Sequence, residues 1–331
     1  MTTVIKMQPS KRASLGLGLA MAGAFVLGLS PVKAEEGYPK KPIEIIVPFA
    51  AGASTDLGMR VIATALENRW KVPVRVINKP GGNTVPAVND VMNAAPEGYT
   101  ILADGPPQSS MLETAVKTLP FKIYDRTFMA IAAYTPMKFI VHIDSPFKTL
   151  QDAADAAKKD PSSFTWTSLG GAGAQDMLNR QFFKALNIDI TKTRALQLKG
   201  GSEAVTMTAG GHVNLGVGSY SAIAAPLQAK KLRVLAVASS ERWPNLPDTP
   251  TAKEAGFPSI EVLYWIGFSG PKGLPADIVA KWDQAVKEIT ADPAIKESLL
   301  KVGLLTSYSN AADMEARVRK EQAETNALWA Q

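Results

Sequence analysis

Short apolar runs alternate with longer amphipathic runs along most of the chain. The β-branched run 43–47 is followed by an amphipathic run over 56–69, and the runs 74–77, 85–94 and 99–102 continue this alternation. Short β-branched runs predict strands, and apolar residues three or four positions apart predict helices. Because strands that alternate with helices favour βαβ units, we predict an α/β fold with a largely parallel sheet.

The alternation begins again after residues 139–143, which predict a strand that carries the chain into a second lobe. Beyond it we predict strands at 164–168, 195–198, 213–217 and 232–237, and helices at 149–159, 175–186, 203–209 and 222–229. A proline-rich connector at 243–258 and three helical runs from Pro275, the last at 312–330, complete the pattern.

These patterns predict two lobes, which agrees with the roughly two domains that 331 residues allow. We assign residues 35–137 and 255–331 to lobe 1 and residues 138–254 to lobe 2. The chain would therefore leave the first lobe and return to it.

The first 34 residues are typical of a secretory signal peptide. A basic start precedes the apolar run 13–29, and Pro31 leads into the small-residue cleavage pattern that ends at Ala34. The run is short for a membrane span, which needs about 20 apolar residues. We expect cleavage after Ala34 and export to the periplasm, with an uncleaved signal anchor as the alternative.

Charge and cysteine usage exclude several functions. The chain has 36 basic and 30 acidic residues, and four of the basic ones lie in the first 34 positions, so the mature part carries a net charge of only +2. A nearly neutral chain without a basic cluster argues against nucleic-acid binding. The absence of cysteine excludes thiol nucleophiles, Cys-containing zinc sites and iron–sulfur clusters.

The candidate chemistry lies in four turns of small residues, each between a predicted strand and a predicted helix. They are residues 49–56, 81–84, 168–174 and 199–202. Free N–H groups and the helix dipole make such turns good anion sites, and small side chains let a carboxylate approach the backbone. The alternative is that the glycines merely connect elements. Asp56 likewise has two interpretations. It is either a partner of the helix dipole or a residue that orients loop amides or a bound water.

Catalytic patterns are weak. His142 and His212 are far apart in the sequence, and we interpret His142 as structural and His212 as a solvated turn residue. Ser145 and Lys148 have the spacing of a serine–lysine nucleophile, but Ser-Pro before a helical run is an ordinary helix start. No carboxylate cluster has metal spacing, and no pattern requires a cofactor.

Several segments resemble, in order and spacing, the solute receptors of tripartite tricarboxylate transporters, also called the Bug family of periplasmic binding proteins. The matching segments are 38–43, 47–56, 78–82, 95–100, 199–201, 232–237 and 247–256. The resemblance covers nearly all of the mature chain. It implies a type 2 periplasmic-binding fold, in which two α/β lobes joined by two crossing segments close over a ligand in the cleft between them.

The resemblance also implies a ligand, a partner and a site. The ligand would be a di-, tri- or aromatic carboxylate, a terephthalate-like dicarboxylate among them, and the partner would be the membrane permease of such a transporter. One carboxylate would be held by the loop 49–56, and lobe 2 would contribute the loops 168–175 and 199–201. We add residues whose side chains would make the pocket polar. The predicted ligand-binding residues are then Phe49, Ala50, Ala51, Gly52, Ala53, Ser54, Thr55, Asp56, Asn83, Thr84, Gln108, Ser168, Gly173, Ala174, Gln175, Lys199, Gly200 and Ser219.

Four departures from the family pattern leave the ligand open. Ala53 stands where a second glycine is common, Asn83 and Thr84 replace a glycine-rich continuation, Gln197-Leu198 replaces Pro-Tyr, and Asn214 replaces a frequent Asp. Such a pocket would be polar without being strongly cationic, which suggests one firmly held carboxylate and a second end bound by neutral groups. We expect a non-catalytic monomer that serves transport. The alternatives are a sensor that signals to a membrane kinase and an exported hydrolase.

Overall fold

The structure is a computed structural model that describes residues 37–170, 173–198 and 200–330. The predicted signal peptide and Lys199 lie outside the described residues. No helix within the described residues is both long enough and apolar enough to cross a bilayer.

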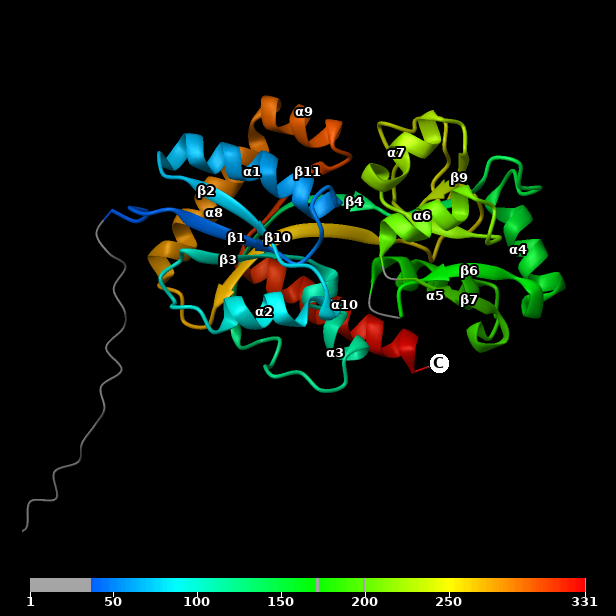
Figure 1. The fold of residues 1–331 in the computed structure, drawn as a ribbon, viewed down its shortest axis with the longest axis horizontal. Helices are drawn as coiled ribbons and strands as arrows, with labels where there is room; N and C mark the ends of the chain where they lie inside the picture. Colours follow the sequence, from blue (N-terminus) through cyan, green and yellow to red (C-terminus); the bar gives the residue numbers. More distant parts are fainter. Residues whose placement is uncertain (1–36, 171–172, 199, 331) are drawn as a thin grey trace, which may run out of the picture. The chain divides into compact units, whose positions relative to one another are not determined.

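A six-stranded sheet forms the centre of the first lobe (Figure 1). Its strands, in spatial order, are β11 (Leu305–Ser309), β4 (Arg126–Pro136), β10 (Leu263–Pro271), β3 (Thr100–Asp104), β1 (Ile43–Val47) and β2 (Val74–Asn78). β1 runs parallel to β2 and β3, whereas β10 is antiparallel to both β3 and β4, and β11 is antiparallel to β4. The sheet is therefore mixed, and the expectation of a largely parallel sheet is wrong.

Helices cover both faces of this sheet. One face is covered by α1 (Ser54–Trp70), α8 (Ala276–Ala291) and α9 (Pro293–Lys301), and the other by α2 (Val85–Met92) and α10 (Ala311–Trp329). In α1 the buried Met59, Ile62 and Leu66 recur every three or four residues and form one apolar stripe against the sheet. β1 is buried on both faces, because Ile45 packs on the α1 side and Ile46 on the α2 side.

The second lobe contains two small sheets. The strands are β8 (Gly216–Gly218), β5 (Lys138–His142) and β9 (Leu232–Val237) in one sheet, and β6 (Thr165–Ser168) and β7 (Arg194–Gln197) in the other. The helices are α4 (Leu150–Lys159), α5 (Ala174–Ala185), α6 (Gly201–Ala209) and α7 (Tyr220–Gln228). Short helical turns complete the described chain, at η1 (Gly82–Thr84), η2 (Pro106–Gln108), α3 (Leu112–Ala115), η3 (Pro161–Ser163) and η4 (Ile190–Lys192). A core that includes Phe139 and Phe182 lies between β5 and α5.

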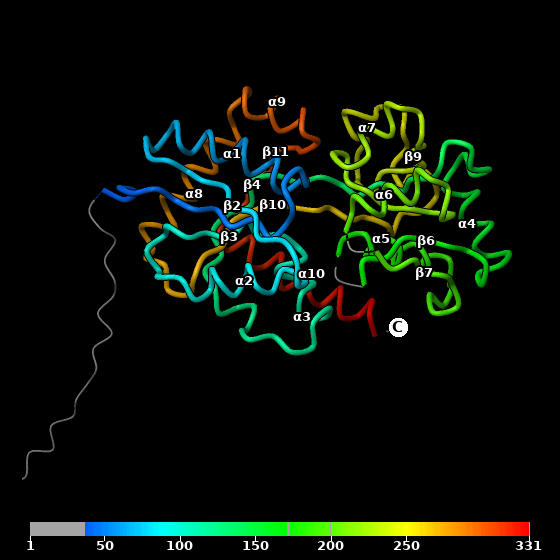
Figure 2. Tube along the Cα trace, in the orientation of Figure 1, coloured from blue at the N-terminus to red at the C-terminus, as the bar shows by residue number. Residues whose placement is uncertain are grey.

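Two segments cross between the lobes side by side, as the trace in Figure 2 shows. β4 ends at Pro136 and β5 begins at Lys138, so the chain changes sheets at Met137. The N–H of Met137 donates to the carbonyl of Val262 (3.0 Å), and its carbonyl accepts from Ala238 (2.8 Å).

Residues just before the return crossing pack in lobe 2. Phe257 and Ile260, which the sequence boundary at 254 assigns to lobe 1, are buried in the core of lobe 2. We therefore propose that the return crossing lies after Val262. Leu328, near the end of α10, is buried in the same core, so the last helix also reaches the second lobe.

Candidate functional site

The loop between β1 and α1 leads into a first helical turn that has no side-chain cap. Gly52 has a φ of 85°, in the left-handed region that favours glycine. Ala53, at the N-cap of α1, provides no side-chain cap, so the first-turn N–H groups keep their capacity to bind a ligand. Ala50, Ala51 and Gly52 are exposed. The loop therefore has the geometry that anion binding at a helix N-terminus requires.

Asp56 holds this loop in place. Its carboxylate is buried and accepts hydrogen bonds from the N–H of Gly52 (2.8 Å) and the amide of Asn78 (2.9 Å), and it forms an ion pair with Arg60 (2.9 Å). Asn78 also donates to the carbonyl of Phe49 (3.0 Å). Burial raises the pKa of Asp56, but the donors outweigh it and hold that pKa below its ordinary value. Since these donors occupy the carboxylate, Asp56 orients loop amides.

Two further turns of lobe 1 carry predicted polar residues, of which Thr84 and Gln108 are buried. Asn83 and Thr84 in η1 have left-handed backbones, with φ of 50° and 68°, which is strained for a β-branched residue such as Thr84. Asn83 is exposed, whereas Thr84 is buried and its hydroxyl has no partner. Gln108 in η2 is fully buried, and its side-chain amide makes no hydrogen bond of ordinary geometry.

The turn that carries Gln108 is fixed by a buried ion pair. Arg126 pairs with Asp104 at 3.1 Å, and both side chains are almost completely buried. Arg126 also donates to the carbonyl of Gln108 (3.0 Å). Gln108 therefore has an anchored backbone, and its buried side-chain amide lies beside the hydroxyl of Tyr264.

The first turn of α1 contacts both the return strand and the second lobe. Thr55 Oγ1 shares a hydrogen bond with Tyr264 Oη on β10 (3.0 Å), and burial raises the pKa of that tyrosine. Ser54 Oγ donates to Ser219 Oγ (2.8 Å) and shares a second hydrogen bond with the hydroxyl of Ser221. Ser219 is the N-cap of α7, so these contacts bring the N-termini of α1 and α7 together.

The start of α5 in lobe 2 repeats the arrangement around Asp56. Asp176 is the third residue of α5, as Asp56 is of α1, and its buried carboxylate accepts from the N–H of Leu169 (3.0 Å) and the hydroxyl of Ser168. Asp176 is not among the ligand-binding residues predicted from the sequence. Its signal was an Asp at the third helical position after a small-residue turn, the same pattern that singled out Asp56.

Gln175 is the other polar residue fixed in this region. Its side-chain Nε2 donates to the carbonyl of Val217 (3.0 Å), and its Oε1 is buried without a partner. A Cβ at Gly201 would lie only 3.1 Å from Nε2, so the start of α6, next to Gly200, packs against this amide. Gly173 and Ala174, both buried, begin the helix that carries Gln175.

The structure thus joins some predicted residues and separates others. Ser54 and Ser219 meet, whereas Ser168 and Gln175 are held within lobe 2. Asn214, a departure from the family pattern, accepts from Thr165 in β6 and stabilises a strand. Lys138, a fully buried lysine at the first crossing, was not predicted at all.

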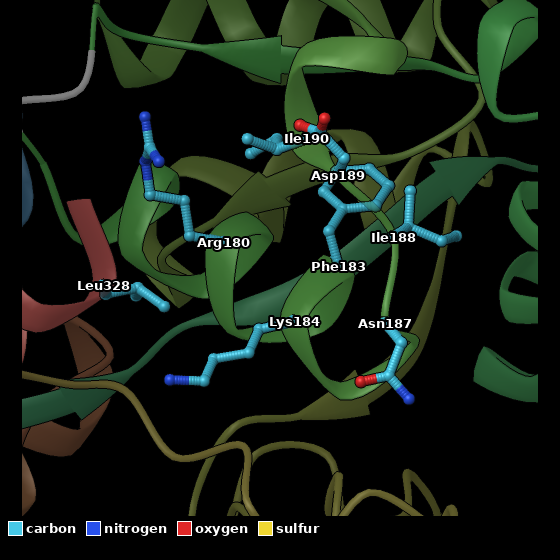
Figure 3. A pocket seen from close by; sticks show the side chains of 8 residues that line it. All are labelled: Arg180, Phe183, Lys184, Asn187, Ile188, Asp189, Ile190 and Leu328. Carbon is cyan, nitrogen blue, oxygen red and sulfur yellow. The ribbon is translucent and has the colours of Figure 1, made fainter. Parts of the chain in front are cut away.

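Two surface hollows lie elsewhere. One, of about 350 Å³, is lined by Arg180, Phe183 and Lys184 of α5 and by Leu328 of α10, among others (Figure 3). A second, of about 540 Å³, lies beside the start of α4. Within the described part of the chain, neither hollow is lined by a predicted ligand-binding residue.

The catalytic patterns have structural explanations. Lys148 donates to the backbone carbonyl of Ser145 (2.9 Å), while the Ser145 hydroxyl accepts from the N–H of Phe147 (3.2 Å), so no lysine contact activates this hydroxyl. His142 accepts from the N–H of Asp144 (3.2 Å) in a turn. Among residues 37–170, 173–198 and 200–330, no group of three His, Asp or Glu side chains could hold a metal ion.

Comparisons with known proteins agree with this architecture. Residues 59–330 match the model of a protein family described as "Tripartite tricarboxylate transporter family receptor". A protein of Cupriavidus necator, "UPF0065 protein in gbd 5'region", is 30% identical over 314 residues, which are 92% of this chain and 94% of that protein. The solved structure of the periplasmic binding protein BugD is 26% identical with a TM-score of 0.77, and the alignment covers 88% of this chain and 98% of that one.

A second solved structure, R. palustris Rpa4515 with adipate, is 24% identical with a TM-score of 0.81. The alignment covers 88% of this chain and 97% of that one. These structures share the two-lobed α/β fold described above.

Proposed function

Because the chain belongs to the tripartite tricarboxylate transporter receptor family, whose members are periplasmic solute-binding proteins, we propose that it captures a small organic carboxylate between its two lobes. In this proposal it then delivers the carboxylate to the membrane subunits of a tripartite transporter. The predicted signal peptide, which lies outside the described residues, would direct the chain to the periplasm.

The observation that carries this proposal is the meeting of two helix N-termini from different lobes. Ser54 begins α1 and hydrogen-bonds Ser219, the N-cap of α7. Each helix directs free N–H groups and the positive end of its dipole toward this junction, and both favour a bound anion. A carboxylate held here would contact both lobes.

Contact with both lobes explains how binding serves transport. A ligand shifts a conformational equilibrium only by its differential affinity for the two states. A carboxylate that contacts both lobes binds the closed form more tightly than the open form, so closure reports occupancy to the membrane subunits. Capture and release require no bond to be made or broken.

The ligand class is supported by a relative of the same fold. Rpa4515, whose structure contains adipate, is similar to this chain in fold. We propose di- and tricarboxylates and aromatic carboxylates as the candidates, and adipate is the first compound to test.

A thermal-shift panel tests the proposal. The purified mature protein is melted with succinate, adipate, citrate, terephthalate, glucose and putrescine. A ligand that binds only the native state stabilises it by about 2.7 kcal/mol at a hundredfold excess over its Kd. For a chain of this length that corresponds to about 4 °C, and we expect at least one carboxylate to produce it.

Matched variants on α1 localise the effect. Ser54→Ala removes the hydroxyl that joins α1 to α7, and we expect it to weaken carboxylate binding about five- to tenfold, the value of one hydrogen bond. Thr64→Ala, at an exposed position of the same helix, should leave binding unchanged. Stabilisation by glucose or putrescine alone would contradict the proposed ligand class.

A further inference from the structure

The first crossing between the lobes contains a fully buried lysine. Lys138 is the first residue of β5, directly after the chain leaves the sheet of lobe 1, and its side chain has no exposed surface. A charged ammonium in such a position loses its hydration, so it is costly unless other groups compensate.

The partners of Lys138 are all neutral. Its Nζ donates to the carbonyl of Pro136 (2.7 Å) and to Thr135 Oγ1 (3.2 Å), and it lies 4.3 Å from the ring centroid of Trp243 and 5.8 Å from that of Tyr220. Among the residues that the structure describes, no carboxylate forms an ion pair with it.

Within the described part of the chain, the other deeply buried cation has a carboxylate partner. Arg126 is buried with a carboxylate, Asp104, at 3.1 Å. Breaking such a pair by removing one partner is strongly destabilising, because it leaves an uncompensated buried charge. Lys138 has no carboxylate partner among the described residues, so burial favours its neutral amine, and a negative charge that would restore the ammonium has to come from outside the chain.

The location of Lys138 indicates where that counter-charge would lie. On one side Lys138 is paired in the sheet with Gly218, the residue before Ser219. On the other side its ammonium contacts Thr135, which is paired across the strands with Tyr264, the partner of Thr55. Lys138 therefore lies between the strand that leads into α7 and the strand pair that carries Tyr264.

We propose that Lys138 is a specificity-determining residue of the carboxylate site, and that its ammonium is the counter-charge for the second carboxylate of a dicarboxylate ligand. The inference rests on the proposed function and sharpens it. The main-chain N–H groups of the α1 loop would hold one carboxylate, and Lys138 would favour a ligand that carries another over a monocarboxylate of the same length.

Proton uptake on binding follows from the burial of this residue. Burial lowers the pKa of Lys138 well below its ordinary value, whereas a nearby carboxylate favours the charged form and raises it again. The titratable or charged side chains on the elements around it are His142 on β5, Arg233 on β9, Tyr220 on α7, Arg126 and Tyr134 on β4 and Tyr264 on β10. The charged Glu241 and Arg242 beside Trp243 are exposed. A dicarboxylate should therefore bind with uptake of a proton, and less tightly as pH rises.

Calorimetric titration of three proteins tests the proposal. Succinate, adipate and terephthalate, and their monocarboxylate counterparts butanoate, hexanoate and benzoate, are titrated into the wild type, Lys138→Met and Lys231→Met. Lys231→Met removes an exposed lysine between α7 and β9 and is the control for net charge. Each titration is run in two buffers of different ionisation enthalpy, so that proton uptake is measured directly.

We expect the wild type to bind its preferred dicarboxylate at least tenfold more tightly than the matching monocarboxylate. Lys138→Met should lose at least tenfold in dicarboxylate affinity and lose the proton uptake, while Lys231→Met stays within twofold of the wild type. Methionine leaves no large cavity but takes the donor away from the carbonyl of Pro136, so the variant should melt at most a few degrees below the wild type. Should it fail to fold, the buffer dependence of the wild type alone still decides the question.

The outcomes separate this inference from the proposed function. Equal dicarboxylate affinity in the wild type and Lys138→Met, or wild-type binding without proton uptake, overturns the role of Lys138 while carboxylate capture stands. Tighter binding of a monocarboxylate overturns it as well. Failure of every carboxylate to bind the wild type overturns the proposed function and this inference with it.

Discussion

Two aspartates at equivalent positions of two helices organise the loops of the candidate site. Asp56 in α1 and Asp176 in α5 are each the third residue of their helix, and each accepts a backbone N–H from the preceding loop, from Gly52 and from Leu169. A carboxylate there also interacts favourably with the helix dipole. The apparent contradiction of an acid in an anion site is thus resolved, since both carboxylates are satisfied by the protein itself.

The pH dependence of stability tests this role for Asp56. Because the pKa of Asp56 in the folded protein lies below its ordinary value of 3.8, its contribution to stability is complete above that value and is lost as pH falls through the folded pKa. Asp56→Asn should lower the free energy of unfolding at pH 7 by about 2 kcal/mol and flatten its decline at acid pH. Urea denaturation between pH 3 and pH 7 measures both effects.

An exposed aspartate provides the control. Asp155 lies on the outer face of α4, and Asp155→Asn should leave the pH profile close to that of the wild type. Identical profiles for Asp56→Asn and the wild type would show that the carboxylate does not hold the loop.

The four candidate loops could be predicted from the sequence, whereas the burial of Lys138 could not. The sequence left two roles open for Asp56, because an Asp at the third position of a helix can interact with the helix dipole or accept a hydrogen bond from a loop amide. Nothing in the sequence indicated that Lys138 is buried, because one lysine in front of the apolar run 139–143 is typical of a strand end at the surface. Its burial arises from Trp243 and Tyr220, which are more than 80 residues away in the sequence and meet it only in the folded chain.

At the scale of elements, the strands missed by the sequence are β4, β10 and β11. All three are antiparallel additions to the sheet, and their sequences lack the β-branched character of β1 and β2. β4 is rich in alanine and β10 contains Gly267 and Gly270, residue types that are depleted in strands. Pairing with distant segments completes them as strands, and such pairing is not visible in a local pattern.

Gly267 shows why β10 contains glycine, and it provides a test of the observed pairing. A Cβ at this position would lie 2.6 Å from the carbonyl oxygen of Ala130 in β4, a backbone atom that cannot move aside. Gly267→Ala should therefore destabilise the protein by about 2 kcal/mol, as measured by urea denaturation.

The matching control has free space around it. A Cβ at Gly200 would meet nothing within 4 Å, and its φ of −174° is available to any residue, so Gly200→Ala should change the stability little. If Gly267→Ala is as stable as the wild type, β10 does not pack against β4 as described.

At the scale of the whole molecule, the two lobes are linked at more places than the two crossings. Both crossings run through hydrogen bonds at Met137, and Leu328 inserts the end of α10 into the core of lobe 2. The hydroxyl of Ser54 adds a contact between α1 and α7. The division into lobes could be expected from the restart of the α/β pattern, but these links could not, because each joins residues far apart in the chain.

The most direct test of the account is a crystal structure of the protein with its tightest-binding dicarboxylate. We predict that one carboxylate accepts hydrogen bonds, at about 2.7–3.2 Å, from main-chain N–H groups between Phe49 and Thr55. The same ligand should also contact lobe 2 near Ser219. A ligand bound instead in the hollow beside Arg180 and Leu328, or one that touches a single lobe, would contradict the account.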